Sequence, residues 1–255
     1  MPKSRICAYC DREGSLTKEH IWPKCIIERT PELTARYAGN QNKFIGAELV
    51  IADVCAECNN KKLSPLDFYL CSLFDSYFKN FCENSDAFDF IYDYDLLLRS
   101  LLKITYNSSR TVIKQDNPLR KYRNLIIEGN MVREDILIKL DLVLPSIEDE
   151  VKMNPNSVRC ASIDMHRTLE HIIVRCIALN SFYFYIVFSK SEILSESTAI
   201  DELRFVMENL PGTIIHPYRS SITVSNISGK NTRDMHEDFI IANQSSYEEF
   251  RKKGK

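Results

Sequence analysis

The stretch that decides the N-terminal fold begins at Cys7-Ala8-Tyr9-Cys10 and ends at Cys55-Ala56-Glu57-Cys58. In each cysteine pair, a gap of two residues lets both sulfurs turn towards one tetrahedral Zn²⁺ ion. The 44 residues between the pairs exceed the spacing of about 15–20 in a simple zinc ribbon. The pattern therefore predicts a structural zinc ion, bound by Cys7, Cys10, Cys55 and Cys58, that closes a loop large enough to hold a second site.

A carboxylate and a histidine stand side by side inside this loop, in Thr17-Lys18-Glu19-His20-Ile21-Trp22-Pro23-Lys24. Such a pair lets one side chain bind a divalent cation while its neighbour takes a proton from water. Directly after the second cysteine pair comes Asn59-Asn60-Lys61-Lys62. The amide oxygen of Asn59 suits the oxygen-rich site of a hard cation, and a lysine suits a phosphate. The candidate contacts to nucleic acid are Lys24, Lys61 and Lys62.

The order C-x2-C, E-H-I-x-P-K and C-x2-C-N-N-x-K, over about residues 5–64, resembles the zinc-containing branch of the HNH endonuclease family. The resemblance implies a ββα-metal fold, in which the first strand of a hairpin presents the Glu-His pair and a helix supplies the last ligand. It implies that His20 is the general base that activates water, and that Glu19 and Asn59 bind a catalytic Mg²⁺ or Mn²⁺ ion. Many stand-alone proteins of this kind look like bacterial anti-phage or restriction components, some acting with an ATPase or sensor partner.

One part of the family pattern is missing. The middle Asn, which usually precedes the second cysteine pair and orients the histidine, has no counterpart between residues 48 and 54. Asp53 is one candidate for this role, and Asn40 and Asn42 from the preceding loop are the others. Further along, Leu98-x3-Leu102-Lys103-Ile104-x-Tyr106-Asn107-x2-Arg110 is similar to a stretch that follows the nuclease motif in such proteins.

The composition places the chain among ordinary globular proteins. Its 255 residues are 44% hydrophobic and 27% charged, enough for a sizeable core. A net charge of -2 gives no general attraction to nucleic acid, although residues 1–64, with ten Lys/Arg and eight Asp/Glu, are slightly basic. No apolar run of about 18 residues occurs. We therefore expect a soluble, cytoplasmic protein with no membrane partner, and the oligomeric state stays open.

Hydrophobic periodicity divides the chain near residue 64. Residues 1–64 form the predicted HNH region, and residues 65–255 form a helical plus mainly antiparallel α+β region for assembly, specificity or regulation. Apolar spacings of three and four predict helices from Ser64 onward and over 95–106, followed by a loop over 107–123. The other expected elements are a hairpin around Gly129-Asn130 with 124–128 as its first strand, strands at 136–144, 157–164, 171–179, 182–188, 213–216 and 221–225, a helix at 199–209, and a frayed tail at 251–255.

Other residues of metal-binding or reactive type have ordinary structural explanations. The acidic residues between 83 and 95 alternate irregularly with aromatic residues, which is typical of a solvated loop. The remaining cysteines sit in apolar settings typical of core thiols, and the remaining histidines lack convincing ligand spacing, so structural or solvent roles are expected. These residues are Cys25, Cys71, Cys82, Cys160 and Cys176, and His166, His171, His216 and His236.

Three functions of different classes stay open on the sequence alone. The main hypothesis is a metal-dependent HNH endonuclease that hydrolyses DNA in anti-phage defence or restriction. The second is a zinc-stabilised module that binds nucleic acid or protein and has lost catalysis, which the missing middle Asn favours and the retention of Glu19, His20 and Asn59 opposes. The third is a toxin-like or RNA-directed nuclease that uses the same site, which the sequence does not separate from the first.

Overall fold

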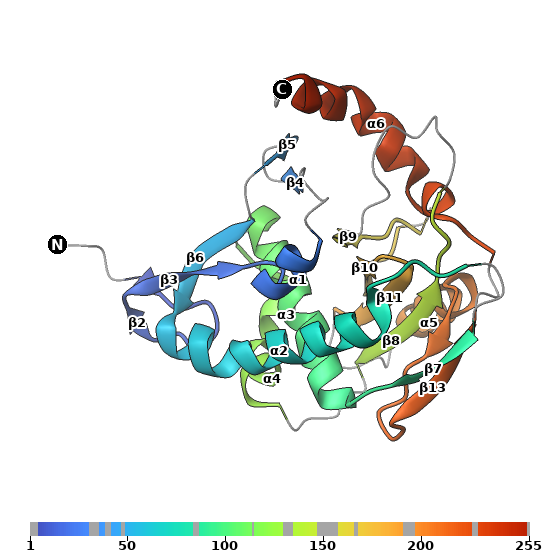
Figure 1. The fold of residues 1–255 in the computed structure, drawn as a ribbon. Coiled ribbons are helices and arrows are strands. Elements are labelled where there is room, and N and C mark those ends of the chain that lie inside the picture. The colour runs from blue at the N-terminus through green and yellow to red at the C-terminus, as the bar shows by residue number, and fades with distance from the viewer. Residues whose placement is uncertain are drawn as a thin grey trace.

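The structure, a computed structural model, describes residues 5–30, 36–38, 42–46, 49–83, 87–113, 115–129, 135–146, 158–165, 168–190, 197–225 and 229–253. Helices and strands are mixed along this part of the chain (Figure 1), and each pair of strands in it is antiparallel. The predicted mixture of helices and antiparallel strands is confirmed.

The N-terminal region is built around the antiparallel pair β3 (Leu16–His20) and β6 (Val50–Cys55). Their register sets His20 opposite Val50. A wide π-helical turn over Cys58–Leu63 follows β6 and leads into the next helix. The strand that carries Glu19 and His20 therefore lies beside the strand that ends at the second cysteine pair. The shorter elements of this region are β1 (Arg5–Ile6), β2 (Glu13–Gly14), α1 (Lys24–Arg29), β4 (Arg36–Ala38) and β5 (Lys43–Ile45).

Two helices, α2 (Ser64–Leu73) and α3 (Tyr94–Val112), pack against each other beside the N-terminal strands (Figure 1). A proline in the first turn of α2 suits the helix start, because its missing N–H has no partner there anyway. The Asp93 carboxylate caps α3 by accepting a hydrogen bond from the Leu96 amide at 3.0 Å. A π-helical turn over Phe74–Phe78 extends α2. The predicted helix from Ser64 onward is confirmed.

The predicted loop over 107–123 is wrong, because α3 continues to Val112. The hydroxyls of Ser109 and Thr111 donate to backbone carbonyls three residues earlier, at 2.8 and 2.7 Å. These bonds give the two hydroxyl groups hydrogen-bond partners within the helix, in a segment that the sequence predicts to be a loop. A 3₁₀ turn, Pro118–Tyr122, then begins after Asn117, whose side chain accepts a hydrogen bond from the Leu119 amide at 3.0 Å.

The first strand of the predicted hairpin is also wrong, because residues 123–128 form the short helix α4 (Arg123–Glu128). Leu125, Ile126 and Ile127 are all buried, so this run does not alternate between a buried and an exposed face as a strand at a surface does. Gly129 ends the helix with a φ of 69°, a conformation that favours glycine. The expected second strand, from residue 131, begins outside the described residues.

The C-terminal region contains a five-stranded antiparallel sheet in the order β12-β8-β11-β10-β9. Asn180, with a φ of 52°, makes the tight turn between the two long central strands, as predicted. β11 is buried along its whole length because elements cover both faces of the sheet. The strands are β8 (Ile136–Leu142), β9 (Val158–Ser162), β10 (Ile172–Leu179), β11 (Phe182–Ser189) and β12 (Thr213–Ile214).

A further strand pair corrects the prediction of a solvated acidic loop. β7 (Ala87–Ile91) pairs with β13 (Ser221–Ser225). Phe90 is fully buried, whereas Asp89 on the other face accepts a hydrogen bond from the hydroxyl of Thr223 at 2.7 Å. Acidic and aromatic residues alternate here because one face of the pair meets the core and the other meets solvent.

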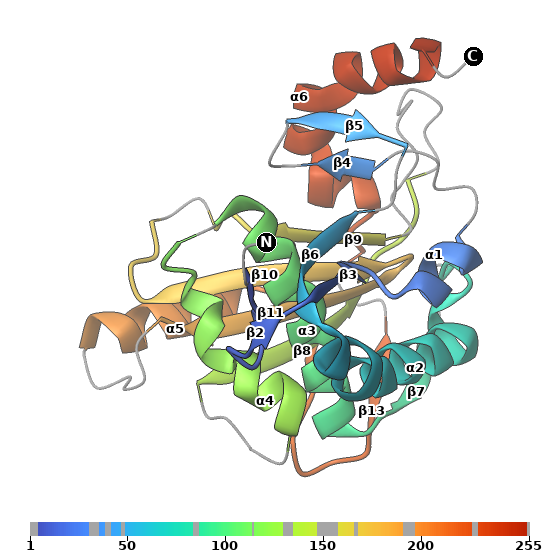
Figure 2. The ribbon, with the colours of Figure 1, turned by 90° about the vertical axis from the view of Figure 1, so that its left-hand side faces the viewer.

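Two helices complete the C-terminal region, α5 (Ser197–Asn209), as predicted, and α6 (Thr232–Lys253), which the sequence did not predict. His236, for which the sequence predicts a structural or solvent role, lies in α6, is buried, and stacks on and hydrogen-bonds to Tyr183 at 3.1 Å. Strands β4 and β5 lie alongside α6 (Figure 2), where the rings of Tyr37 and Phe239 are 5.1 Å apart. The predicted frayed tail is helical as far as Lys253.

We predict that protonation of His236 destabilises the protein in acid. Burial lowers the pKa of His236 to about 3, and the positive charge of Arg159 acts in the same direction. In the unfolded chain a histidine has a pKa of about 6.5, so the unfolded state binds more protons between these two values and stability falls as the pH is lowered through them. The expected contribution is a loss of about 3 kcal/mol near pH 4.

Urea unfolding at pH 7 and near pH 4 measures this effect. His236→Gln keeps a hydrogen-bonding side chain towards Tyr183 but does not titrate, so its stability should fall less over this range than that of the wild type. The exposed His216→Gln is the matched control and should keep the wild-type pH dependence. Equal pH dependence in wild type and His236→Gln would refute the prediction.

One disulfide joins the N-terminal region to α2. Cys25 of α1 is bonded to Cys71 of α2, which corrects the expectation that both are free core thiols. One hydrophobic cluster also includes residues from both sides of position 64, such as Val54 and Leu101. The predicted domain boundary at residue 64 stays a prediction. Among the described helices, none is long and apolar enough to cross a membrane.

Candidate zinc centre and adjoining carboxylate-histidine site

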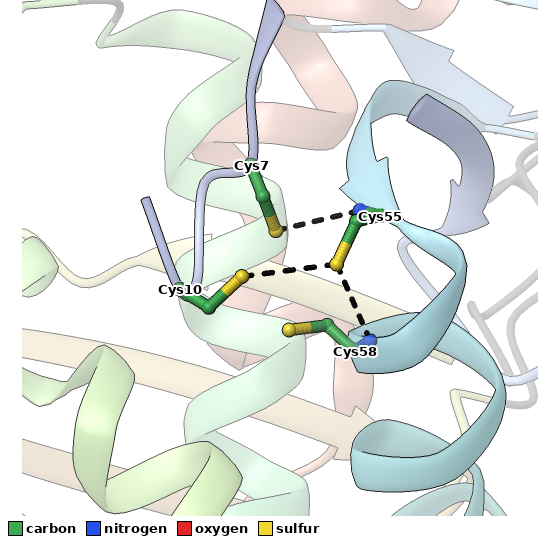
Figure 3. A group of neighbouring side chains, drawn as sticks. All are labelled: Cys7, Cys10, Cys55 and Cys58. Atoms are coloured by element: carbon green, nitrogen blue, oxygen red, sulfur yellow. Dashed lines mark hydrogen bonds between the residues drawn. The ribbon is translucent and has the colours of Figure 1, made fainter. Parts of the chain in front are cut away.

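Four cysteines from the two ends of the predicted loop lie together and point towards one another (Figure 3). The Sγ atoms of Cys7, Cys10, Cys55 and Cys58 all lie within 4.8 Å of one another, and those of Cys10 and Cys55 are 3.7 Å apart. Thiolates bound at about 2.3 Å to a tetrahedral zinc ion are about 3.8 Å apart. The cluster therefore has the donor set and the spacing that one zinc ion requires.

Backbone hydrogen bonds hold the first cysteine pair against β6. The Cys7 amide donates to the Arg12 carbonyl at 2.9 Å and closes a tight turn. The Ala8 amide donates to the Asp53 carbonyl of β6, also at 2.9 Å. The Cys55 amide donates to the Cys7 sulfur at 3.4 Å. Hydrogen bonds that involve the backbone of β6 thus hold the two cysteine pairs together, in addition to the contacts between their sulfur atoms.

Two thiols of the cluster, Cys7 and Cys58, have pKa values shifted in opposite directions. Burial by itself raises the pKa of Cys7, but hydrogen bonds from the backbone of Cys55, Cys10 and Tyr9 outweigh it and bring the pKa to about 7. For Cys58, burial and the neighbouring thiols raise the pKa well above its ordinary value. One thiolate forms readily, whereas a set of four needs a compensating cation, and a zinc ion supplies that charge.

Glu19, the predicted cation ligand, is buried and already paired with a positive charge. Its Oε1 atom lies 2.6 Å from the ammonium group of Lys103, a residue of α3 that is 1% exposed. The same ammonium group pairs with Asp67 of α2. Burial raises the pKa of Glu19, and the charge of Lys103 opposes this shift. A buried carboxylate therefore depends on a helix outside residues 1–64 for its partner.

Asn107 of α3 connects the first cysteine pair to the strand that carries His20. Its Nδ2 atom donates to the His20 carbonyl at 3.3 Å. Its Oδ1 atom accepts hydrogen bonds from the Tyr9 hydroxyl and from the Arg110 guanidinium, both at 2.6 Å. Because Tyr9 lies between Cys7 and Cys10, the buried side chain of Asn107 connects the turn that carries these two cysteines to the end of β3.

Asn59 lies against β3, beside the two residues that precede the Glu-His pair in that strand. Its Nδ2 atom donates to the Thr17 hydroxyl at 2.9 Å and to the Lys18 carbonyl at 3.0 Å. His20 is half-buried at the end of β3. Within the described residues, the side chains of Glu19 and Asn59 share no hydrogen bond. The structure therefore brings the three predicted residues to one strand and the turn packed on it, without direct contact between the two predicted ligands.

The candidates for the missing middle Asn do not bond to His20 in the part of the chain that the structure describes. Asp53 lies 3.5 Å from the Arg110 guanidinium, and Asn42 pairs with the Tyr37 hydroxyl. Asn40 lies outside the described residues. Among the described residues, Asn107, which the sequence interpretation did not assign to the site, donates a hydrogen bond to the His20 carbonyl.

The three lysines predicted to contact phosphate are exposed or half-buried, and each pairs with a carboxylate. Ion pairs of this kind at a surface contribute less than about 1 kcal/mol, so they leave a lysine free to exchange its partner for a phosphate. The partners are Glu28 for Lys24 at 3.6 Å, Glu57 for Lys61 at 2.9 Å, and Glu128 for Lys62 at 3.3 Å.

Lys103 and Asn107 are the residues that the sequence interpretation missed. They stand four residues apart on α3, inside a run of buried apolar residues. A lysine within such a run signals a buried ionic partner, because an unpaired charge is rarely left in a core. The similarity of residues 98–110 to a stretch that follows the nuclease motif is a second signal, but neither signal identifies the partner.

Loss of the Lys103 ammonium group should strongly destabilise the protein. In Lys103→Met the carboxylates of Glu19 and Asp67 lose their shared cation, and breaking a buried pair costs about 3–5 kcal/mol. Urea unfolding measures this loss. The control Lys62→Met breaks a more exposed pair with Glu128 and should cost less than about 1 kcal/mol. Equal losses in the two variants would contradict this description of the Glu19 pair.

Comparison with known proteins adds no relative. No protein-family profile matches the chain, and no curated protein or solved structure is significantly similar to it.

Proposed function

We propose that this protein is a metal-dependent endonuclease of the HNH type that hydrolyses phosphodiester bonds of DNA. The observation that supports the proposal best is the position of Asn59. This residue directly follows the four-cysteine cluster, and its side chain bonds to Thr17 and Lys18, the two residues before Glu19 and His20. A cluster that suits zinc is thus followed by a residue that packs on the strand carrying Glu19 and His20, and this supports the proposal that the three residues act in one site.

His20 is the proposed general base. A neutral imidazole at the end of β3 accepts a proton from the water that attacks the phosphate, so a second metal ion is not needed for that step. The carbonyl of His20 is held by Asn107, which fixes the backbone from which the imidazole projects.

The donor chemistry around Glu19 and Asn59 fits a hard divalent cation. Lys103 and Asn107 contact Glu19 at its Oε1 atom, and the side-chain nitrogen of Asn59 donates to Thr17 and Lys18 of β3. Oε2 of Glu19 and Oδ1 of Asn59 accept no hydrogen bond from the described residues, and Mg²⁺ and Mn²⁺ prefer such oxygens. When bound, the cation supplies positive charge that stabilises the developing charge on the phosphate.

Asn59→Ala should raise the Mg²⁺ concentration needed for half-maximal cleavage by at least about tenfold, because it removes one proposed ligand oxygen. Asn60→Ala, at the exposed neighbouring position, is the matched control and should leave the Mg²⁺ dependence unchanged. A Mg²⁺ titration of the cleavage rate compares the two variants. If their titration curves coincide with that of the wild type, Asn59 is not a ligand.

The proposed substrate is DNA, with Lys24, Lys61 and Lys62 as contacts to its phosphates. Because the net charge of the chain is near neutral, we propose that a partner such as an ATPase or sensor protein brings the protein to DNA. The experiment incubates the full chain with duplex DNA, single-stranded DNA and RNA in Mg²⁺, in Mn²⁺ or in EDTA, with and without the proteins encoded beside it. Metal-dependent cleavage of DNA supports the proposal. Cleavage of RNA alone would instead identify an RNA-directed nuclease.

One observation favours the second hypothesis, a zinc-stabilised module without catalysis. The Lys103 ammonium group sits where a cation bound to Glu19 would otherwise supply charge, which lowers the affinity of that carboxylate for a metal ion. In that case the same assay gives binding of nucleic acid or protein without cleavage in every metal. The catalytic hypothesis is preferred because Glu19, His20 and Asn59 are all retained.

A further inference from the structure

A cavity of about 970 Å³ lies at the edge of the C-terminal sheet, apart from the zinc cluster. Its walls come from β9, the C-terminal end of α3, α6 and the residues that follow β3. Because β9 is the edge strand, the cavity reaches both faces of the sheet there. Aromatic side chains, among them Trp22, Tyr37 and Phe239, form part of the wall. A space of this size accommodates a molecule as large as a nucleotide.

Arg159 of β9, a half-buried residue, brings a positive charge to this cavity. Its guanidinium lies over the ring of Phe239, 4.0 Å from the ring centre. Its Nη1 atom is buried and has no hydrogen-bond partner among the described residues. Burial lowers the pKa of Arg159, and no carboxylate contributes to the shift. A desolvated guanidinium without a partner is costly, and an anionic ligand removes this cost.

Arg175 of β10 brings a second guanidinium from the other face of the sheet. The register sets Arg175 opposite Ser162 and Arg159 opposite Ala178, so the two arginines point to opposite faces. Arg175 donates to the hydroxyl of Ser162 at 2.6 Å and to that of Ser108 at 3.2 Å. Its Nε atom is buried and has no hydrogen-bond partner in the described part of the chain. The cavity wall therefore contains two guanidinium groups, and each has a buried nitrogen without a hydrogen-bond partner among the described residues.

Acidic residues in the cavity wall do not neutralise these arginines. Asp234 accepts a hydrogen bond from the Asn231 amide at 3.2 Å, and Glu237 lies 3.9 Å from the guanidinium of Arg233. Among the described residues, no ion pair joins Arg159 or Arg175 to a carboxylate. His236, beside Arg159, is neutral at pH 7 because its pKa is lowered to about 3. Arg159 therefore has no carboxylate paired with it in the described part of the chain.

We propose that this cavity binds a phosphate-bearing small molecule of nucleotide size, with a phosphate on the Arg159 guanidinium and an aromatic part against the ring-lined wall. The planar guanidinium donates to two phosphate oxygens at once, and among the described residues no carboxylate pairs with Arg159 to compete for these donors. The unused Nε of Arg175 and the hydroxyls beside it provide further donors at the other end. The proposal does not depend on nuclease activity.

Binding of inorganic phosphate, pyrophosphate and ATP to the purified full chain tests the proposal, with adenosine and citrate as comparison ligands and with ionic strength held constant. ATP or pyrophosphate at millimolar concentration should raise Tm, because a ligand that binds only the folded state stabilises it. Arg159→Met should weaken ATP binding at least about 30-fold, the loss expected for a charged hydrogen-bonding partner. Arg204→Met, at an exposed position of α5, should bind as the wild type does.

The Tm of ligand-free Arg159→Met separates a binding role from a structural one. If the guanidinium has no partner in the free protein, its replacement by an apolar side chain leaves Tm unchanged or raises it. Arg159→Gln provides a second variant should methionine prevent folding, and it should show the same loss of ATP binding. If the wild type binds none of phosphate, pyrophosphate and ATP, the proposal is overturned. Stronger binding of citrate than of these ligands, or a marked fall in the ligand-free Tm of both variants, would also overturn it.

Discussion

Cys58→Ala is expected to lose its zinc and to unfold the N-terminal region, the largest effect on stability of any substitution considered. A structural zinc ion contributes about 10–16 kcal/mol of apparent folding free energy in small zinc domains at neutral pH. In its described residues, the region that it holds has short strands, the six-residue helix α1 and the π-helical turn over Cys58–Leu63. Removal of one of four sulfurs that lie within 4.8 Å of one another leaves an incomplete site.

Elemental analysis and circular dichroism measure this outcome. Wild-type protein should contain about one zinc ion per chain, and Cys58→Ala should contain little zinc and expose the N-terminal region to proteolysis. The matched control is Cys176→Ala, which removes a buried thiol from the C-terminal sheet and should keep its zinc. A Cys58→Ala protein that is folded and has full zinc content would contradict the assignment of the four-cysteine cluster.

His20→Ala is expected to lower the cleavage rate by about 10²–10⁴-fold, the usual contribution of a general base. The substitution removes the imidazole but keeps the carbonyl to which Asn107 donates, so the end of β3 should hold its position. Zinc content and Tm should therefore match the wild type, and only the rate should fall. Initial rates on a labelled duplex, at equal zinc content, measure the effect.

His216→Ala is the matched control for this substitution, since His216 is exposed and lies outside the candidate site, between β12 and β13. It should cleave as the wild type does. If His20→Ala retains the wild-type rate, the base is elsewhere, whereas a fall in Tm together with the rate would indicate a structural role for His20.

Local patterns in the sequence predicted the parts of the structure that depend on local spacing. The two-residue gaps of the cysteine pairs are enough to predict that their four sulfurs meet, and the alternation of residues 171–188 is enough to predict two adjacent strands. The helix from Ser64 follows from its apolar stripe in the same way. The helix and the two strands are set by patterns within a few residues along the chain, whereas the two cysteine pairs, 44 residues apart, are connected by their shared donor chemistry.

The elements that were predicted wrongly depend on contacts that are distant in sequence. Residues 107–112 look like a loop because they are polar, yet Asn107 is buried by Tyr9 and His20, which lie near the N-terminus. Residues 124–128 look like a strand by composition, but all three of their aliphatic side chains are covered. α6 was missed because its partners, β4 and β5, come from residues 36–45.

The candidate site shows the same division. Glu19, His20 and Asn59 stand out by residue type and by their place between and beside the cysteine pairs. Lys103, which sets the charge state around Glu19, lies 84 positions further along the chain, and no local pattern connects the two residues. Sequence reasoning therefore identified the residues of the strand and predicted the helix over 95–106, but it did not predict that Lys103 and Asn107 of this helix contact the strand.

The central claim is that the zinc-bound protein hydrolyses DNA through His20. The most direct test measures the conversion of supercoiled plasmid to nicked and linear forms by the full-length, zinc-loaded wild type and His20→Ala proteins, each in Mg²⁺, in Mn²⁺ and in EDTA. If the central claim holds, the wild type converts the plasmid in the presence of a divalent cation and converts little of it in EDTA. The His20→Ala protein then converts little plasmid in any of the three conditions. Equal conversion by the two proteins, or conversion that is unaffected by EDTA, would contradict it.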